Sequence, residues 1–466
     1  MMPSRLLDSI RATLLMGVAI AMVSAHAQEQ PVAKPEKEVG VHEFTLENGL
    51  KLVVKEDHRA PVVSTQVWYR VGSAYEPEGK TGVSHVLEHM MFKGTQTRGP
   101  NEFSQIVAAN GGVENAFTSR DYTAYHQRIE KSKLPLMFEL EADRMRNLLL
   151  DKAEFNKERR VVMEERRLRT DDSPRGKTYE QLYATAFQVS PYRHPVIGWT
   201  DDLKNLTLDD MREWYTTWYA PNNATVVVVG DVRPAYVHRL AKRTFGKLEP
   251  QEIKPGRKLN EPEQLGERRT VVRKKAKQPY LLMGYRAPVL ATADEDWEVY
   301  ALDVASSVLD GGDSARLTSE LVRGSEIAAT AGAGYSITGL YDDLFLLTAI
   351  PSEGVPLDEL EAALKAQVAK LRDELVSAEE LERIKTQAIA EKVYKRDSIQ
   401  SQAIEIGVLE TVGDGWRVEQ EYLDRIKAVT AEQVQAVARK YLLNQRLTVA
   451  LMKPLPLSDS AALSAH

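Results

Sequence analysis

The chain has 466 residues, of which 43% are hydrophobic and 27% charged; this is typical of a globular protein and long enough for two domains of roughly 200 residues each. Its formal net charge of −6 argues against nucleic acid as the main partner, because neutralising phosphates requires a surplus of Lys and Arg. There is no cysteine, so His and carboxylate side chains are the remaining strong metal ligands.

Residues 1–27 have the pattern of a secretory signal peptide. Two arginines precede an apolar stretch from Thr13 to Val23, and Ala25-His26-Ala27 provides the small residues that signal peptidase requires. The apolar stretch is too short to span a bilayer as a stable helix, although a short N-terminal membrane helix is the alternative. We therefore predict export to the periplasm or the medium, without stable membrane insertion after signal removal.

Residues 40–247 contain both strand and helix patterns. A hairpin is predicted from Phe44 to Val54 with Asn48-Gly49 at its turn, and a strand from Val62 to Val71. The stretch from Val113 to Ile129 is rich in Thr, Tyr and Phe and is expected to be extended. Helices are predicted over residues 82–93, 101–109, 132–149, 152–170 and 208–218, followed by a turn at 221–223 and a buried strand at 224–228.

The second half repeats the plan of the first. Residues 248–264 carry several prolines and charges with little periodicity, and they form the predicted linker. Beyond it, Leu281 to Arg286 is similar to Val67 to Arg70, and the helix and strand after Thr430 are similar to those after Thr207. We therefore predict an α+β fold of two homologous domains, residues 40–247 and 265–454, each a β-sheet packed with helices.

The stretch from Thr81 to Gly94 contains the motif His-x-x-Glu-His. Thr81 as a capping residue, apolar residues at helical spacing and Gly94 at the end predict a helix. His85 and His89 would lie one turn apart on one face, so that both imidazoles could bind one metal ion. Glu88 lies near that face and could accept a proton from a metal-bound water. The alternative is a pair of solvated or core histidines on an amphipathic helix.

A catalytic zinc site needs a third protein ligand and leaves one position to water. In the predicted helix from Lys152 to Arg169, Glu158 and Glu165 are two turns apart and share a face. We expect Glu165 to bind the metal and Glu158 to lie beside it, orienting a histidine or the water. Glu164 and Glu139 are the alternatives for the third ligand, and without the histidine motif this helix would be interpreted as a charged surface helix.

The second half cannot contain the same site. No histidine occurs from Arg239 to Ala465, so the matching region, Asp296 to Gly312, lacks the imidazole ligands. The asymmetry predicts a catalytic zinc-binding domain at 40–247 and a homologous domain without metal at 265–454.

These motifs together resemble the pitrilysin/insulinase metallopeptidases. The inverted His-x-x-Glu-His order and the later glutamate at Glu165 carry the resemblance, which is nearest to short bacterial members similar to the β subunit of mitochondrial processing peptidase. It covers essentially the whole mature chain. Further matching motifs are Asn48-Gly49-Leu50, Gly111-Gly112, Asn115-Ala116-Phe117-Thr118-Ser119 and Trp218-Tyr219-Ala220-Pro221-Asn222-Asn223.

The resemblance implies a role for each matching residue and a clamshell arrangement of the two domains around a chamber. A substrate peptide is expected to add as an extra strand to the edge strand beside the metal. The implied zinc ligands are His85, His89 and Glu165, the general base is Glu88, the second carboxylate near the metal is Glu158, and the edge strand is Asn115, Ala116, Phe117 and Thr118.

The second domain departs from the family pattern. Family members often have an arginine followed within two turns by a tyrosine, both directed at the substrate carbonyl, and Arg323 matches the arginine. Ala328-Ala329 stands at the place of the tyrosine, and Tyr335 comes several residues late. Oxyanion stabilisation by a tyrosine is therefore not expected, and the metal would have to supply more of it. Arg323 as a surface ion-pair partner is the alternative.

The sequence thus predicts a zinc metalloendopeptidase acting on peptides or unfolded polypeptides. A zinc ion would lower the pKa of its water, and Glu88 would transfer the proton to the leaving amine. One alternative is a catalytically idle peptide-binding or scaffolding subunit of a heteromeric peptidase, and another is a structural or storage zinc site, in which Glu88 would have no role. The expected assembly is a homodimer or a heterodimer with a related inactive subunit.

Overall fold

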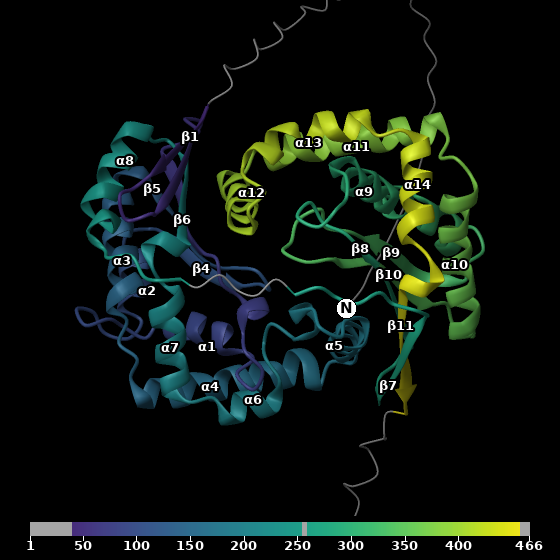
Figure 1. The fold of residues 1–466 in the computed structure, drawn as a ribbon, viewed down its shortest axis with the longest axis horizontal. Helices are drawn as coiled ribbons and strands as arrows, with labels where there is room; N and C mark the ends of the chain where they lie inside the picture. Colours follow the sequence, from purple (N-terminus) through teal and green to yellow (C-terminus); the bar gives the residue numbers. More distant parts are fainter. Residues whose placement is uncertain (1–39, 254–258, 457–466) are drawn as a thin grey trace, which may run out of the picture. The chain divides into compact units, whose positions relative to one another are not determined.

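The structure is a computed structural model that describes residues 40–253 and 259–456 (Figure 1). The predicted signal peptide at 1–27 and the centre of the predicted linker lie outside the described residues. Within the described ranges, no helix is both long and apolar enough to cross a bilayer.

The first domain is built on a six-stranded mixed sheet in the order β1-β2-β6-β3-β5-β4. The predicted hairpin is confirmed: β1 and β2 are antiparallel, with Thr45 opposite Lys51 and Gly49 at a φ of 84° in the turn. β2 and β6 are parallel, and the other neighbours are antiparallel. The strands are β1 (Val41–Thr45), β2 (Lys51–Glu56), β3 (Val62–Tyr69), β4 (Val113–Thr118), β5 (Thr123–Glu130) and β6 (Ala224–Gly230).

The second domain repeats this sheet, with no counterpart of β1 among the described residues. Its order, β7-β11-β8-β10-β9, has the same neighbours and strand directions as β2-β6-β3-β5-β4. The prediction of an α+β fold with two homologous domains is therefore confirmed, whereas their limits stay predictions. The strands are β7 (Arg268–Lys275), β8 (Tyr280–Ala287), β9 (Ala328–Gly334), β10 (Asp343–Pro351) and β11 (Leu447–Leu455).

The helices also repeat. α7 (Leu208–Trp218) and α14 (Ala431–Tyr441) begin with matching capping boxes, in which the hydroxyls of Thr207 and Thr430 accept from the backbone three residues on. Apart from α5 and α12, which are described below, the remaining helices are α1 (Val83–Met90), α2 (Glu102–Ala109), α3 (Leu134–Asn147), α4 (Lys152–Arg166), α6 (Thr200–Asn205), α8 (Pro234–Arg243), α9 (Asp296–Asp310), α10 (Leu357–Asp373), α11 (Ala378–Lys395) and α13 (Arg417–Ala428).

Three predicted elements differ from the observed ones. The helix expected to reach residue 93 ends at Met90, and the stretch predicted as extended from 113 to 129 is two strands joined by a turn at 119–122. The helix predicted to run to residue 170 is α-helical only to Arg166 and continues as a π-helical turn, Arg167–Asp171.

The two domains exchange one helix each. α5 (Pro174–Ala186) of the first domain packs on the second sheet, where Leu182 and Ala186 are buried with Leu282. α12 (Ile399–Val412) of the second domain packs on the first sheet, where Ile406 is buried with Trp68. Figure 1 shows α12 beside β6 and α5 beside β11. Each sheet therefore has one face covered by the other domain.

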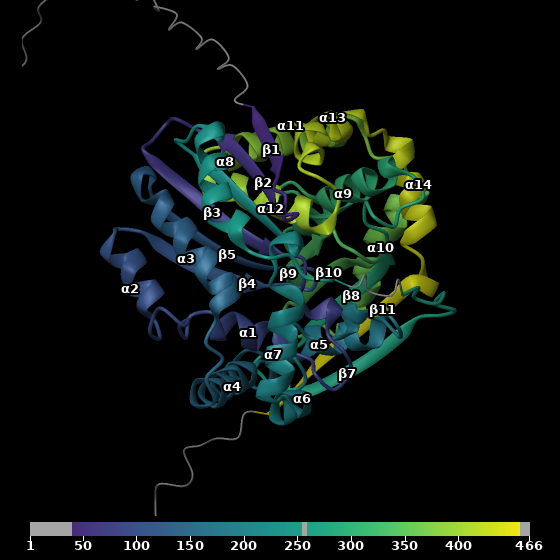
Figure 2. The same cartoon turned by 60° about the vertical axis from the view of Figure 1, so that its left-hand side comes forward.

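α1 and α4 lie next to each other close to the end of β4, as both views show (Figures 1 and 2). α1 contacts both β4 and α4. This corner of the first domain holds the residues that the sequence singled out.

Candidate active site

The helix that carries the histidines is capped by a carboxylate from the preceding loop. α1 begins at Val83, and its N-cap is Gly82 at a φ of 89°, with no side-chain cap of its own. Glu76, which is buried, accepts hydrogen bonds from the backbone N–H groups of Gly82 (2.7 Å) and Ser84 (2.8 Å). Burial raises the pKa of Glu76 to about 7, and the two backbone donors oppose this shift.

The prediction that Thr81 caps this helix is wrong. The left-handed conformation at Gly82 turns the chain, so the Thr81 hydroxyl bonds to α6 and to the loop before it instead. It donates to the Asp202 carboxylate and accepts from the Trp199 backbone N–H at 2.8 Å. Thr81 thus ties the start of α1 to the segment that follows α5.

Three predicted metal ligands converge. The distances to Glu165 Oε2 are 3.8 Å from His85 Nε2 and 3.6 Å from His89 Nε2, and one donor atom from each residue lies within 4.8 Å of the others. Two atoms that each bind one zinc ion at about 2.1 Å lie no more than about 4.2 Å apart, so both imidazole–carboxylate pairs are close enough to share an ion.

The surroundings of both imidazoles favour metal binding. The Nδ1 atom of His89 lies 3.2 Å from Glu158 Oε2, which leaves Nε2 directed at Glu165. Glu158 is buried and also pairs with Lys93, at 3.0 Å. Burial, with smaller contributions from His89 and Arg169, lowers the pKa of His85 to about 3, so its imidazole is neutral, which is the form that binds a metal.

Glu88 lies beside the metal ligands and is held by the edge strand. The Thr118 hydroxyl donates to Glu88 Oε2 at 2.5 Å. Burial raises the pKa of Glu88, and the hydrogen bond from Thr118 opposes this shift. A raised pKa suits a carboxyl group that must first accept a proton and then donate it.

A cavity of about 540 Å³ connects these groups to the edge strand. Because β4 is the last strand of its sheet and pairs only with β5, the backbone groups on its other side face away from the sheet. The residues that line the cavity are His85, Glu88, His89, Asn115, Ala116, Phe117, Thr118, Glu165, Arg169, Thr170, Val196 and Ile197.

Sequence reasoning did not single out Arg169, Thr170, Val196 and Ile197 in this cavity, nor Glu76 beneath it. Val196 and Ile197 lie in an irregular loop and belong to no motif. Arg169 was included in the predicted helix but given no role, and its spacing of four residues from Glu165 was the signal that could have identified it.

The alternative third ligands lie elsewhere. Glu164 is exposed and pairs with Arg167, its neighbour on the next turn. Glu139 is exposed on α3. Neither contributes to the group of metal-binding side chains found among the described residues, which consists of His85, His89 and Glu165.

The structure does not bring Arg323 into this cavity. Arg323 follows a π-helical turn, Leu317–Val322, and its exposed guanidinium donates to the backbone carbonyl of Asp313. The hydroxyl of Tyr335 donates to the carbonyl of Pro288. A contact between Arg323 and the substrate stays a prediction.

Comparison with known proteins agrees with this geometry. The sequence model described as "Insulinase (Peptidase family M16)" matches residues 51–199, and the one described as "Peptidase M16 inactive domain" matches residues 205–388. Zinc protease PqqE of Helicobacter pylori is 36% identical over 358 residues, covering 76% of this chain and 80% of that protein. The probable mitochondrial-processing peptidase subunit beta of Arabidopsis thaliana is 27% identical over 426 residues, covering 88% and 78%.

Solved structures share the fold. The crystal structure of a protease from Helicobacter pylori has a TM-score of 0.85 at 33% identity and covers 89% of this chain and 100% of that chain. The first half of the periplasmic protease PqqL from Escherichia coli has a TM-score of 0.72 at 20% identity, covering 88% and 91%, which is a likeness of fold alone. The chain therefore belongs to the pitrilysin/insulinase family of zinc metallopeptidases.

Proposed function

We propose that this chain is a zinc metalloendopeptidase that hydrolyses peptides or unfolded polypeptides. The observation that carries the proposal is the convergence of His85, His89 and Glu165 in one cavity with Glu88 and an open edge strand. Metal ligands alone would suit a structural site. Glu88 is a buried carboxylate beside the candidate ligands that is not one of them, and this arrangement suits catalysis.

The residues present fit a catalytic zinc ion. Two imidazoles and one carboxylate are a donor set that zinc accepts, and the contact of His89 with Glu158 is the carboxylate–histidine pairing that orients such ligands. When bound, zinc supplies a lowered pKa for a coordinated water and polarisation of the scissile carbonyl. His85, His89 and Glu165 would hold it.

Glu88 is the proposed general base and acid. The Thr118 hydroxyl engages Oε2, so Oε1 is the oxygen available to take a proton from the attacking water. The same carboxyl then delivers that proton to the leaving amine. A raised pKa serves the second step, because it favours the protonated carboxyl that acts as the acid.

The edge strand explains the proposed substrate class. A peptide that pairs with β4 over Asn115 to Thr118 must itself be extended, and its main-chain groups provide the hydrogen bonds. A folded segment has these groups engaged in its own helices and sheets. Peptides and unfolded polypeptides are therefore the substrates that this surface accepts.

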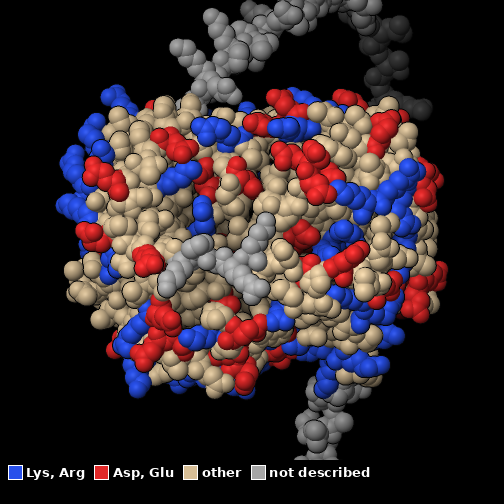
Figure 3. Space-filling model, viewed as in Figure 1, with Lys and Arg blue, Asp and Glu red and all other residues tan. Residues whose placement is uncertain are grey.

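Localisation and partners form part of the same proposal. The signal pattern at residues 1–27 supports export to the periplasm or the medium, and a solved relative of similar fold is called a periplasmic protease. The net charge of −6, with acidic and basic side chains interspersed on the face in Figure 3, supports a protein rather than a nucleic-acid partner. The proposed assembly is a homodimer or a heterodimer with a related inactive subunit.

The test uses the purified mature chain and an unstructured peptide. We expect one zinc ion per chain by atomic absorption, cleavage that stops when a chelator removes the metal, and recovery when zinc is restored. Zinc binding without cleavage of any member of a peptide library would refute the enzyme and favour the idle peptide-binding subunit. Mass spectrometry of the products would also give the cleavage preference.

A further inference from the structure

Arg169 is a cationic side chain in the active-site cavity with no role in metal binding. Of the described residues that line this cavity, it is the only Lys or Arg. Its guanidinium Nη1 lies 2.6 Å from Glu165 Oε1, whereas the other oxygen of Glu165 faces the two histidines. The Arg169 side chain is 75% exposed, so its remaining N–H groups are open to a molecule that enters the cavity.

A π-helical turn directs Arg169 toward the cavity. α4 changes from α-helical to π-helical geometry at Arg167, and the turn ends at Asp171. Such turns are rare and occur frequently at functional sites. Gly176 packs against this turn so closely that a Cβ there would lie 2.2 Å from the carbonyl oxygen of Arg169. This close packing fixes the position of the Arg169 backbone.

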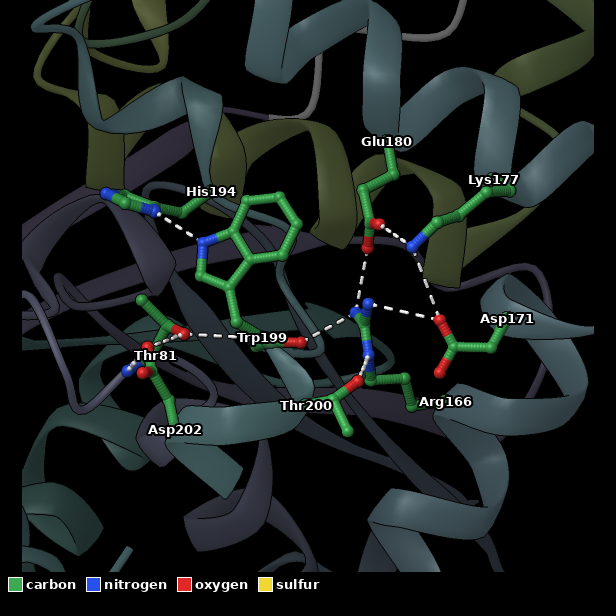
Figure 4. Close-up of polar contacts among 10 residues, drawn as sticks. Thr81, Arg166, Asp171, Lys177, Glu180, His194, Trp199, Thr200 and Asp202 are labelled. Carbon is green, nitrogen blue, oxygen red and sulfur yellow. Dashed lines mark hydrogen bonds and ion pairs between the residues drawn. The ribbon is translucent and has the colours of Figure 1, made fainter. Parts of the chain in front are cut away.

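A buried arginine anchors the same turn. Arg166 lies at the centre of the polar network in Figure 4, with Glu180, Asp171 and Thr200 directed at its guanidinium. The distances are 2.8 Å to Glu180, 3.3 Å to Asp171 and 2.8 Å to the Thr200 hydroxyl. Lys177 bonds to both acidic partners, so the charges are balanced.

The network also connects the turn to the histidine helix. Arg166 donates to the carbonyl of Gly198 at 2.7 Å. Gly198 packs directly on the residues that precede α1, since a Cβ at Gly198 would lie 2.4 Å from the carbonyl oxygen of Thr81. The segment that carries Arg169 is thus held against the helix that carries His85 and Glu88.

Arg169 lies close to both His85 and Glu88. It lines the same cavity as these two residues, and Glu165, the carboxylate that it pairs with, has its other oxygen 3.8 Å from His85 Nε2. The guanidinium therefore lies in the cavity in which the proposed general base acts.

Peptide hydrolysis develops a negative charge that a guanidinium can stabilise. Attack by water turns the scissile carbonyl oxygen into an oxyanion, and preorganised donors aimed at that oxygen are the usual source of its stabilisation. The second domain lacks the tyrosine of the family pattern, and Tyr335 has its hydroxyl engaged with a backbone carbonyl. Arg323 is engaged in the same way.

We propose that Arg169 is a catalytic residue of this chain, whose guanidinium donates to the oxyanion that develops on the scissile carbonyl. The inference rests on the peptidase function proposed above. One edge of the planar guanidinium pairs with Glu165, and the other edge is free to donate to the substrate.

The first test compares Arg169→Ala with the full-length zinc-loaded protein. We expect kcat to fall about 10²-fold with KM little changed, which is the effect of removing one oxyanion donor. Zinc stoichiometry and Tm should stay near wild type. Guanidine hydrochloride at millimolar concentration should restore part of the activity of Arg169→Ala, which a merely structural role would not allow.

The matched control is Arg167→Ala. Arg167 lies in the same π-helical turn with the same charge, but it pairs with Glu164 and Asp172 on the surface and does not line the cavity. Its kcat should stay within about twofold of wild type, because exposed ion pairs contribute little. An equal loss in both variants would mean that the turn, and not the guanidinium of Arg169, matters.

A second readout is independent of turnover. A phosphinic peptide is a tetrahedral, anionic mimic of the attacked carbonyl, and we expect Arg169→Ala to bind it about 10²-fold more weakly than wild type. Binding of an ordinary substrate peptide, measured in the Glu88→Gln background, should be unchanged.

The outcomes separate the two proposals. A rise in KM at constant kcat would make Arg169 a substrate-binding residue, loss of zinc would make it a positioning residue, and wild-type behaviour would make it a surface ion pair; each of these overturns the inference. If the wild-type protein neither cleaves peptides nor binds the phosphinic peptide, the peptidase function is wrong and the inference falls with it.

Discussion

The same place in the two domains is occupied by helices of different kinds. Along the chain, α1 comes between β3 and β4, and α9 comes between the corresponding strands β8 and β9. α1 has eight residues and turns His85, Glu88 and His89 toward a cavity. α9 has 15 residues, of which ten are buried within its own domain. The same position in the duplicated plan therefore carries candidate active-site residues in the first domain and core residues in the second.

The neighbouring helices differ in the same way. α4 contacts α1 and supplies Glu165, whereas α11 contacts α9 and contributes Leu381 and Ile384 to an apolar core. The strand topology is the same in both domains. The comparison teaches that the sheet fixes where two helices meet, while the side chains on the facing surfaces decide whether a group of candidate metal ligands or an apolar core forms there.

The largest effect is expected when α1 loses its general base. Glu88→Gln removes the group that accepts the proton but keeps the shape and the contact with the Thr118 hydroxyl. We expect kcat to fall by about 10²- to 10⁴-fold, with zinc content and Tm near wild type. Peptide cleavage and atomic absorption measure the two effects. Turnover close to that of wild type would show that Glu88 is not the general base.

The contribution of α4 is tested by Glu165→Ala. Two imidazoles alone do not make a catalytic zinc site, so zinc affinity should fall by more than the roughly 10- to 100-fold typical of losing an outer partner. Glu164→Ala is the control, because Glu164 is adjacent in sequence but exposed. Unchanged zinc stoichiometry in Glu165→Ala would mean that another carboxylate is the third ligand.

The exchanged helix α12 is tested by Gly407→Ala. A Cβ at Gly407 would lie 2.0 Å from Cε2 of Trp68, in a buried contact between the domains. We expect the free energy of unfolding to fall by about 1–3 kcal/mol without loss of zinc. Gly266→Ala is the control, because a Cβ at Gly266 would have no neighbouring atom within 4 Å. Equal stability of the two variants would contradict tight packing of α12.

The smallest effect concerns Asp303, one of the acidic residues of α9. Asp303 has its pKa raised by burial, which the hydrogen bond from the Tyr422 hydroxyl opposes. Because the folded-state pKa lies above the unfolded one, this group stabilises the fold at pH below its unfolded pKa, and the contribution is lost as pH rises through the folded value. Asp303→Asn should make stability less dependent on pH above about 4, as measured by denaturant unfolding at a series of pH values. An unchanged pH profile would exclude the effect.

The first domain could be predicted where local patterns are strong. Asn48-Gly49 between apolar stretches specified the hairpin, and the repeated Thr-initiated helix before a buried strand revealed the duplication. The motif of His85 and His89 identified the helix that carries two of the three candidate metal ligands, because helical spacing alone sets which side chains share a face.

Features that depend on an unusual backbone conformation or on distant segments escaped prediction. The cap supplied by Glu76 requires the left-handed backbone of Gly82, and the threonine next to it gave a false capping signal. The π-helical turn that directs Arg169 depends on the burial of Arg166 against α5. The exchange of α5 and α12 involves surfaces far away in the sequence, which no local periodicity encodes.

The exchange of helices has a consequence for biogenesis. The apolar face of the first sheet around Trp68 is formed by strands that are complete at residue 230. The helix that packs on this face, α12, begins only at Ile399. A nascent chain therefore leaves that apolar face in water until most of the polypeptide has been synthesised. Folding of the N-terminal domain must wait for the C-terminal one, and truncation shortly before Ile399 would yield an aggregation-prone fragment rather than a smaller folded protein.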